Sequence, residues 1–477
     1  MAYCGYVITV KDLRPHPNAE RLQLLRVFGT DTCVGLDVKL GDRGVYFPTD
    51  GQLSEEFCQV HDLVRRKDEQ GNAAGGFLEP GKRNIKAIKL RGERSDGLYM
   101  PLSCLEYTGV KLEDFADGDT ITVVNKHEIC QKYIPRSNKS AGSAPTGNRT
   151  RKHKVPYAPL FAEHADTEQL VYNLAAFRPG DQIEITLKMH GTSQRTGYLP
   201  VFQGYISSIP WVRWVIKYIN PDTKNKFAQW LLKDAMKDAK PVYGWDYVTG
   251  TRRVVLENYD GGFYGGNGFR AQHAKTFEGK LQKGETVYYE VVGFTDTGVP
   301  IMPSVNNKKL NDKDFIKQYG EETVFSYGCE PVATPAVIKA PEMTETIPAK
   351  PQSDIYVYRM TMTNEEGFVV EYAPDFMRYR CEQMGVKCVP VLWKGTIPID
   401  ENPTEDVLYL TEQYCGGTDP IGKTHIREGV VVRIINRPKF TAYKHKNFEF
   451  KVLEGIAKTD ATAPDMEEAE EVTASES

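Results

Sequence analysis

The chain has 477 residues and a net charge of −4, with 40% apolar, 26% charged and 11% aromatic residues. At about 100–200 residues per domain, this length predicts two or three domains. The ordinary composition excludes a wholly disordered chain, a collagen and a coiled-coil rod. Apolar runs are shorter than the about 18–20 residues that a bilayer span requires. Because the first residues also lack a basic segment followed by an apolar one, we expect a cytoplasmic protein with no membrane partner.

Nine cysteines are scattered along the chain, and none forms a C-x-x-C pair. The closest two, Cys381 and Cys388, are seven residues apart. An odd number at such spacing predicts reduced thiols, and neither a disulfide framework nor a structural zinc site.

Short apolar runs separated by turn signals extend from residue 5 to about residue 125, a spacing typical of a small β-barrel. The run HPNAERLQLLRV also resembles the opening of tRNA-binding OB-like modules. Residues 1–130 are therefore predicted to form an OB-like nucleic-acid-binding domain with a helix at 54–66. Residues 82–94 carry six Lys or Arg, which indicates either a nucleic-acid contact, with Tyr99 as a stacking platform, or a charged barrel exterior.

The next segment, 131–157, is rich in Ser, Gly, Pro, Lys and Arg and has no apolar periodicity. It is predicted to be a basic flexible linker, which acts either as a solvated tether alone or also as a contact to phosphate groups. Residues 158–457 follow as a second domain of strands with a few helices. In it, 225–237 has the spacing of an amphipathic helix, which we expect to pack on the domain body with Trp230 in the core.

Two further segments have a biased composition. Residues 331–352 contain five prolines and are predicted to be an extended surface insertion. Residues 458–477 hold seven acids and a single lysine, so they are predicted to be a disordered acidic tail. The rest of the chain consequently has a positive net charge.

The segment 181–193 is the most informative for chemistry. Ile183, Ile185 and Leu187 alternate with polar residues, which predicts a half-buried strand. Lys188 ends this strand on its polar face, directly before the turn-forming HGTS. A lysine held in this way can act as a nucleophile, although taken alone it would be read as an exposed strand-end residue.

Three later strands carry charges in unusual places. Glu290 lies within the apolar run TVYYEVVG, and Glu428 leads into three consecutive valines. Lys444 and Lys446 are two residues apart, so they project from one face of a strand. Like charges placed so close cost free energy unless an anion lies between them. A lysine nucleophile, two carboxylates and a lysine pair suit a site for a nucleoside triphosphate and a metal ion.

The sequence Lys-Met-His-Gly-Thr-Ser at 188–193 resembles motif I of the covalent nucleotidyltransferases, in the form used by nick-sealing RNA ligases. Further segments resemble the other motifs in family order: 250–255 motif Ia, 289–293 motif III, 355–359 motif IIIa, 427–432 motif IV and 444–447 motif V. Six elements in order are far more specific than one. The resemblance implies an α+β fold, with the OB-like barrel followed by an adenylyltransferase ligase domain of ATP-grasp-like antiparallel sheets.

The resemblance also implies roles for the reacting groups. Lys188 would attack the α-phosphate of ATP to form a lysyl–AMP, while Lys444 and Lys446 neutralise the charge that builds on the phosphate. Glu290 would bind the ribose hydroxyls. Glu428 would hold Mg²⁺ or Mn²⁺, since hard cations prefer oxygen ligands.

The remaining implied roles concern the base and the polynucleotide. Tyr358 would stack on adenine, with Tyr356, which alternation places on the same strand face, as the alternative. Arg252, with Arg253 as its alternative, would bind the 5′-phosphate end. Ser193 stands where the family often has Asn, and its proposed place is beside that phosphate. His190 is expected to fix the turn and not to carry a proton.

Together these features resemble a branch of ATP-dependent RNA ligases that carries an OB-like module before the catalytic domain. The implied substrate is a nicked duplex with 3′-OH and 5′-phosphate ends, and a monomer is expected. One alternative is a DNA ligase or capping-type nucleotidyltransferase, which usually has Asp at the position of His190. Another is a non-catalytic nucleic-acid-binding protein with a degenerate ligase fold.

Overall fold

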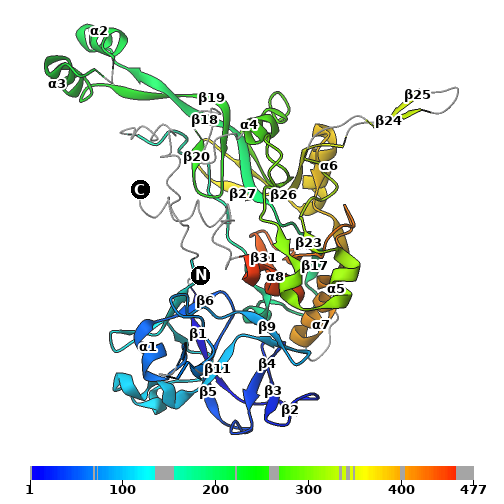
Figure 1. Ribbon diagram of the computed structural model, residues 1–477. Coiled ribbons are helices and arrows are strands. Elements are labelled where there is room, and N and C mark those ends of the chain that lie inside the picture. The colour runs from blue at the N-terminus through cyan, green and yellow to red at the C-terminus, as the bar shows by residue number, and fades with distance from the viewer. Residues whose placement is uncertain are drawn as a thin grey trace.

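A computed structural model describes residues 3–67, 70–71, 73–134, 155–220, 223–256, 268–331, 336–339, 344–347, 350–397 and 403–457. Figure 1 shows an N-terminal part, in blue and cyan, below a larger part that contains the remaining strands and most of the helices. Most of the predicted linker and the whole predicted acidic tail fall outside the described residues. Within the described residues, no helix is long and apolar enough to cross a membrane.

The N-terminal part is built from short antiparallel ladders. A four-stranded sheet has the order β11-β5-β1-β12, and a three-stranded sheet the order β2-β3-β4. The bounds are β1 (Gly5–Thr9), β2 (Leu13–Pro15), β3 (Leu22–Val27), β4 (Thr30–Gly35), β5 (Arg43–Phe47), β11 (Leu98–Pro101) and β12 (Thr120–Ile121). Two-stranded ladders join β6 (Gly51–Leu53) to β15 (Cys130–Lys132), β7 (Arg65–Lys67) to β8 (Ala73–Gly75), β9 (Ala87–Leu90) to β10 (Glu93–Asp96), and β13 (Val123–Val124) to β14 (His127–Glu128). The described strands do not form one closed barrel, so the OB-like assignment stays a prediction.

Two features of this part differ from expectation. The helix predicted at 54–66 is shorter: α1 spans Glu55–Val60, capped by the Ser54 side chain, and the left-handed backbone at Asp62 (φ 50°) stops its continuation. Tyr99 is only 7% exposed, so the prediction that it is a stacking platform is wrong. The reason is that Tyr99 lies on β11, next to the central strand β5, where its ring packs into the domain core.

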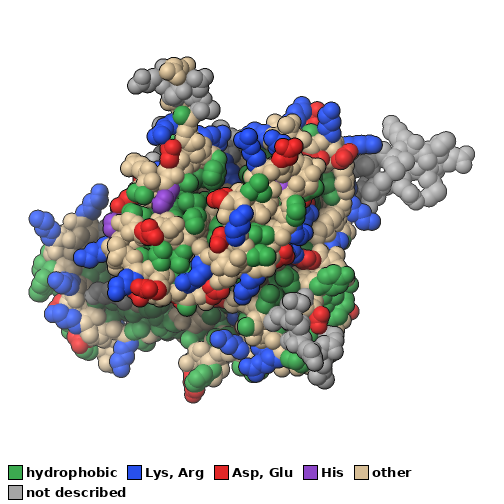
Figure 2. All heavy atoms as spheres, turned by 90° about the horizontal axis from the view of Figure 1, so that it is seen from below, with side chains coloured by type: hydrophobic (Ala, Val, Ile, Leu, Met, Phe, Trp, Pro, Cys, Tyr) green, Lys and Arg blue, Asp and Glu red, His purple; other side chains and the backbone are tan. Residues whose placement is uncertain are grey.

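The predicted basic stripe at 82–94 is partly consumed by contacts within the chain. Arg94 binds Glu449 at 2.5 Å, and Lys89 binds Asp312 at 2.8 Å, so both tie the N-terminal part to the larger part. On the face seen in Figure 2, Lys and Arg side chains are interspersed with Asp and Glu. A stacked contact of Tyr6 with Tyr172, with ring centroids 4.6 Å apart, adds to the same junction.

A five-stranded sheet carries the strand of Lys188. Its order is β16 (Glu168–Gln169), β31 (Thr441–Lys446), β30 (Gly429–Ile434), β17 (Gln182–Lys188) and β29 (Val391–Thr396). Neighbouring strands pair antiparallel, except that β16 pairs parallel with β31. Ile183, Ile185 and Leu187 are at most 2% exposed, which confirms the strand predicted from their alternation.

A larger sheet holds the strands of Ser193, Glu290 and Tyr358. Its order is β20 (Val255–Leu256), β19 (Lys240–Gly250), β18 (Thr192–Ile206), β21 (Glu285–Gly293), β26 (Ser353–Thr363) and β27 (Val369–Glu371), with β28 (Lys387–Cys388) paired to β26. The helices of the body are α4 (Gly268–Lys275), α5 (Lys313–Tyr319), α6 (Pro374–Met384), α7 (Pro403–Cys415) and α8 (Phe448–Ala457). One hydrophobic cluster joins β21 and β26 to α6 and α8.

The minor elements complete the chain. Strand β22 (Val305–Asn306) pairs with β23 (Glu322–Thr323). Short 3₁₀ turns occupy Leu102–Thr108, Leu112–Asp114, Leu170–Tyr172, Leu174–Ala176 and Asn307–Leu310. In the proline-rich insertion, the described residues form a ladder of β24 (Ala336–Lys339) and β25 (Thr344–Ile347) that projects from the body (Figure 1). All nine cysteines are free thiols.

The helix predicted at 225–237 exists as α3 (Lys226–Ala235), but its predicted position is wrong. Strands β18 and β19 extend beyond the sheet as a ribbon, and α3 lies at its far end with α2 (Pro210–Tyr218) (Figure 1). Trp230 is 59% exposed and is not a core residue. The apolar positions of α3 pack on α2 instead of on the domain body.

Candidate active site

Strand register places the three predicted lysines on one sheet face. Lys188 lies opposite Gly429 of β30, and Gly429 lies opposite Lys446 of β31. Lys444 is two residues before Lys446 on the same strand, so its side chain is on the same face. The alternation read from the sequence therefore becomes a cluster of three amines at the end of the five-stranded sheet.

Two glycines allow the backbones around this cluster to come close. A Cβ at Gly429, whose φ is +153°, would lie 2.1 Å from the carbonyl oxygen of His445. A Cβ at Gly191 would lie 2.4 Å from the carbonyl oxygen of Val291 on β21. Any side chain at either position would push strands apart, so these glycines hold the Lys188 turn against β21 and β30 against β31.

Glu428 is the carboxylate that compensates the lysines. Its side chain is 3% exposed, and Oε1 accepts a hydrogen bond from Lys188 Nζ at 2.6 Å. Lys446 Nζ is 3.9 Å from the same oxygen and also binds Glu454 of α8 at 2.7 Å. The Glu428 carboxylate is therefore held by the positive charges of two lysines, and its role as a metal ligand stays a prediction.

Lys444 has the least compensated charge in the cluster. Burial and the positive charges of Lys188 and Lys446 lower the pKa of Lys444 to about 8. In the part of the chain that the structure describes, no salt bridge to Lys444 is formed. Among the three lysines, Lys444 is therefore the one whose half-buried charge a bound anion would compensate most.

His190 is held by packing, in agreement with its predicted role in the turn. Its ring lies edge-on to Phe325 and Phe450, with centroids 4.5 and 4.8 Å away. Its backbone N–H donates to the Tyr327 hydroxyl at 2.7 Å. Its Nδ1 is 3.7 Å from Glu428 Oε2, so the turn is fixed against the carboxylate as well.

The larger sheet contributes the facing side chains. Ser193 lies opposite Glu290 in the β18–β21 ladder. The β21–β26 register shifts between Tyr288 and Tyr289, which leaves Tyr358 as the extra residue of a bulge. Its hydroxyl is 2.7 Å from Ser193 Oγ. A bulge redirects the side chain at that position, and such bulges are common beside active sites.

This bulge separates the two tyrosines that the sequence placed on the same face. Tyr356 is 5% exposed, packs in the hydrophobic core and donates its hydroxyl to Asp354 at 3.2 Å. Tyr358 lines the cavity described below, and Tyr356 does not. The structure therefore brings Tyr358, and not the alternative, to the lysine cluster.

The two candidate arginines also separate. Both pair with Asp166, Arg252 at 3.1 Å and Arg253 at 3.4 Å. The side chain of Arg252 is 24% exposed and that of Arg253 is 47% exposed. Arg252 lies between the lysine cluster and the N-terminal part. It lines both cavities described below, the one that contains the lysines and the one that adjoins the N-terminal part.

Two neighbours of these residues were missed by sequence reasoning. Asp166 orients Arg252, and His164 Nδ1 lies 3.3 Å from the Tyr358 hydroxyl. Burial, then the charge of Arg252, lowers the pKa of His164 to about 3, so its imidazole is neutral. They lie in a segment without regular structure just after the predicted linker, where no periodicity marks individual positions.

All eight predicted site residues line one cavity of about 240 Å³. They are Lys188, Ser193, Arg252, Glu290, Tyr358, Glu428, Lys444 and Lys446. Leu187, Met302 and Val389 add apolar wall. The cavity thus combines apolar and aromatic side chains with several cationic ones, a lining that suits a nucleotide.

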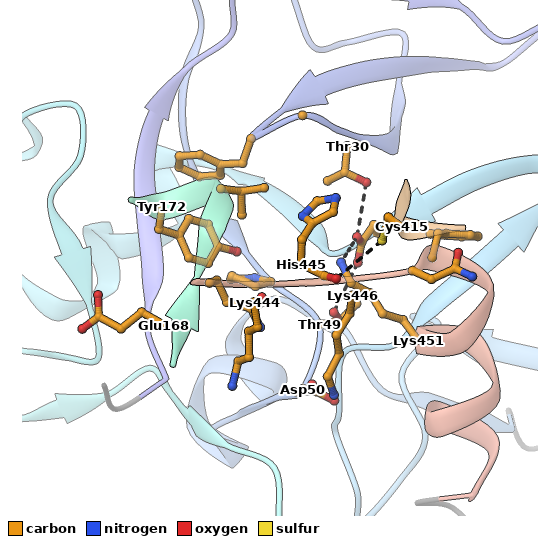
Figure 3. A pocket seen from close by; sticks show the side chains of 18 of the residues that line it. Thr30, Thr49, Asp50, Glu168, Tyr172, Cys415, Lys444, His445, Lys446 and Lys451 are labelled. Carbon is orange, nitrogen blue, oxygen red and sulfur yellow. Dashed lines mark hydrogen bonds and ion pairs between the residues drawn. The ribbon is translucent and has the colours of Figure 1, made fainter. Parts of the chain in front are cut away.

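A second cavity of about 910 Å³ adjoins the first, between the N-terminal part and the larger part (Figure 3). Arg252, Lys444 and Lys446 line both cavities. Lys451 extends the cationic lining toward the N-terminal part, where it binds Asp96 at 2.6 Å. Cationic side chains are therefore shared between the two cavities where they adjoin.

Glu428 is also the residue best suited to a divalent cation. Its Oε2 is buried and accepts no hydrogen bond from the described residues. No group of three or more His, Cys, Asp or Glu suited to a metal ion occurs among those residues. A cation here would therefore take Glu428, phosphate oxygens and water as ligands, a set typical of Mg²⁺.

Comparison with known proteins identifies the fold. No protein-family model and no curated protein matches the sequence. Among solved structures, an RNA ligase from Naegleria gruberi, a lysine-to-alanine mutant with ATP and Mn, matches with a TM-score of 0.52 and 15% identity over 94% of this chain and 98% of that chain. The Naegleria gruberi RNA ligase with PPi matches with a TM-score of 0.51 and 15% identity over 94% and 97% of the two chains. The chain therefore shares its overall fold with these RNA ligase structures.

Proposed function

We propose that this protein is an ATP-dependent RNA ligase that joins 3′-OH and 5′-phosphate ends at nicks in a duplex. The observation that carries the proposal is the single cavity at which all eight predicted residues meet. Three lysines and a carboxylate come from the five-stranded sheet or the turn that leads into it, and Glu290 and Tyr358 come from the facing sheet. Such convergence from distant segments is expected of a site and is not required by the fold's core.

In the first step, Lys188 Nζ attacks the α-phosphorus of ATP as a neutral amine. A P–N bond forms, the bond to the bridging oxygen of the β-phosphate breaks, pyrophosphate leaves, and the proton lost from the nitrogen passes to solvent. Lys444 and Lys446 lie on the same sheet face as Lys188, where they neutralise the charge that develops on the α-phosphate. Tyr358 stacks on the base, and Glu290 accepts hydrogen bonds from the ribose.

In the next two steps, the nucleotide passes to the polynucleotide. The 5′-phosphate oxygen displaces Lys188 from the AMP phosphorus, and Arg252, held by Asp166, binds that 5′-phosphate. The 3′-hydroxyl then displaces AMP and closes the phosphodiester. The larger cavity, beside Arg252, is the space through which the strand ends enter, with the N-terminal part as the second wall.

ATP with Mg²⁺ or Mn²⁺ is the proposed cofactor set. Structures of the Naegleria gruberi ligase contain ATP and Mn, AMP and Mn, or PPi, which supports this choice. Glu428 would hold the cation, which would supply Lewis-acid stabilisation of the phosphate charge.

Mass spectrometry of the protein after incubation with ATP and Mg²⁺ tests the proposal. We expect the mass of one AMP to be added to Lys188 and to be absent from the Lys188→Met variant. Lys308→Ala is the matched control, because Lys308 is 59% exposed and lies outside both cavities. An AMP adduct that persists in Lys188→Met would refute the assignment of the nucleophile.

A sealing assay on nicked duplexes with the four RNA and DNA combinations at the nick tests the second half of the proposal. We expect joining that requires an RNA strand at the 3′-OH side or the 5′-phosphate side. No sealing of any duplex by protein that forms the AMP adduct would exclude ligation and leave only nucleotidyl transfer to the protein.

A further inference from the structure

The arm formed by β18, β19, α2 and α3 extends the strand that carries Ser193. Strand β18 pairs with β21 only from Thr192 to Gly197. Beyond Gly197 it pairs with β19 alone, as far as Ile206 opposite Lys240. The result is a two-stranded ribbon with both helices at its tip, far from the domain body (Figure 1).

The tip has a small core of its own. Val212 and Val215 of α2 pack with Ala235 of α3, and all three are at most 2% exposed. The apolar faces of α2 and α3 are thus buried against each other. Side chains on their other faces are not needed to hold the tip together.

Five large aromatic side chains nevertheless point outward from the tip. Their exposed fractions are 43% for Trp211, 56% for Trp214, 63% for Tyr218, 67% for Phe227 and 59% for Trp230. The rings of Phe227 and Trp230 are stacked, with centroids 5.9 Å apart and an interplanar angle of 24°. The ring centroids of Trp214 and Tyr218 also lie 5.9 Å apart. So many exposed aromatic rings on two adjacent helices are a mark of a binding surface.

The charge of the tip is complementary to a polyanion. Residues 207–240 contain seven Lys or Arg, three Asp and no Glu, whereas the chain as a whole is slightly acidic. Lys217 lies over the Tyr218 ring, 5.2 Å from its centroid. Lysines bind the phosphates of a duplex, and exposed aromatic rings beside them can pack on its sugars or stack on unpaired bases at a strand end.

The ribbon also fixes how far the tip lies from the chemistry. From Ser193 to Ile206 the strand advances thirteen residues, or about 40 Å at the usual rise of a β-strand. That length corresponds to roughly one helical turn of a duplex. An anionic membrane would also suit aromatic and cationic side chains. The direct connection of the tip to the strand of Ser193 favours the nucleic acid.

We propose that the α2–α3 tip binds the duplex about one helical turn from the nick, through its exposed aromatic side chains and its lysines. The inference rests on the proposed function, because it deepens the recognition of the same substrate. It makes the arm a positioning element that contributes to substrate affinity and not to lysyl–AMP formation.

The test uses the full chain with a double variant, Trp214→Ala/Trp230→Ala, and a charge variant, Lys217→Glu/Lys233→Glu. Phe368→Ala is the matched control, since Phe368 is 68% exposed and belongs to the β26–β27 turn. We expect the Kd for a nicked duplex of about 24 base pairs to rise at least about tenfold in the double variant, and to stay within about twofold in the control. The charge variant should lower the salt dependence of binding.

Three further measurements keep the outcome decisive. AMP-adduct formation without nucleic acid should be unchanged in both tip variants, because the tip is not part of the lysine site. If the wild-type protein forms no adduct, the proposed function is refuted, whereas the inference about the tip is tested separately by duplex binding. Trimming the duplex to about six base pairs on each side should reduce wild-type affinity to that of the double variant. Unchanged duplex affinity in both tip variants would overturn the inference. The inference would also be overturned if the tip variants lost binding to phosphatidylserine vesicles but kept their affinity for the duplex.

Discussion

Replacement of Glu428 by Gln removes the carboxylate at the centre of the lysine cluster and keeps its shape. At an effective dielectric constant of about 20, the contacts of Oε1 with Lys188 at 2.6 Å and with Lys446 at 3.9 Å correspond to about 6 and 4 kcal/mol of attraction. Desolvation of the buried carboxylate offsets several kcal/mol of this attraction. Solvent also screens the attraction between Glu428 and Lys188, because the Lys188 side chain is 23% exposed. We therefore expect a net loss of about 2 kcal/mol of unfolding free energy.

The activity of Glu428→Gln should fall far more than its stability. Loss of the proposed metal ligand removes stabilisation of the charged phosphate, so the rate of AMP-adduct formation should fall at least about 100-fold. Stopped time courses read by mass spectrometry measure that rate, and thermal unfolding measures the stability. Glu371→Gln is the control: this 12% exposed carboxylate binds Arg359 outside both cavities, and its loss should lower stability but leave the rate nearly unchanged. A Glu428→Gln rate within about threefold of wild type would refute the reasoning.

Three further predictions concern the cavity. Because its surroundings lower the pKa of Lys444 to about 8, this side chain is cationic below that pH and loses its charge above it. ATP affinity, measured by calorimetry, should therefore fall between about pH 7 and 9.5. The Lys444→Ala variant should show a smaller fall over the same range. An identical pH slope in the variant would contradict this role. Arg252→Ala should slow AMP transfer from the labelled enzyme to a 5′-phosphate at least about tenfold more than Arg253→Ala does. Single-turnover assays measure this rate. Equal effects of the two substitutions would contradict the assignment of the 5′-phosphate contact to Arg252. Tyr358→Phe keeps the ring and loses the hydroxyl contacts with Ser193 at 2.7 Å and His164 at 3.3 Å, so its ATP affinity should stay within about threefold of wild type. Tyr358→Ala, which also loses the ring, should lose about tenfold or more. Equal losses would show that the hydroxyl, not the ring, matters.

Local patterns in the sequence were sufficient for the strands that present the lysines. Alternation of Ile183, Ile185 and Leu187 determined which face of that strand packs in the hydrophobic core, and so placed Lys188 on the polar face, although Glu184 on that face is also buried. The spacing of two between Lys444 and Lys446 determined that they share a face. These inferences hold because side-chain direction in a strand depends on position along the chain and on little else.

The same logic failed where neighbouring strands alter the local geometry. Alternation placed Tyr356 and Tyr358 together, but a bulge between β21 and β26 sends the first into the core and leaves the second at the cavity. A bulge depends on the register with a partner strand, and a single strand's sequence does not contain that register.

The apolar pattern of 225–237 predicted a helix correctly, because the 3.6-residue period is a local property. What covers that helix was decided by the tertiary structure, in which a ribbon carries α3 away from the body and leaves Trp230 exposed. Likewise, nothing local marked His164 or Asp166, which reach the site only because distant segments converge on it. Sequence alone thus determined the elements and the directions of their side chains, whereas packing between distant elements determined which of those side chains meet.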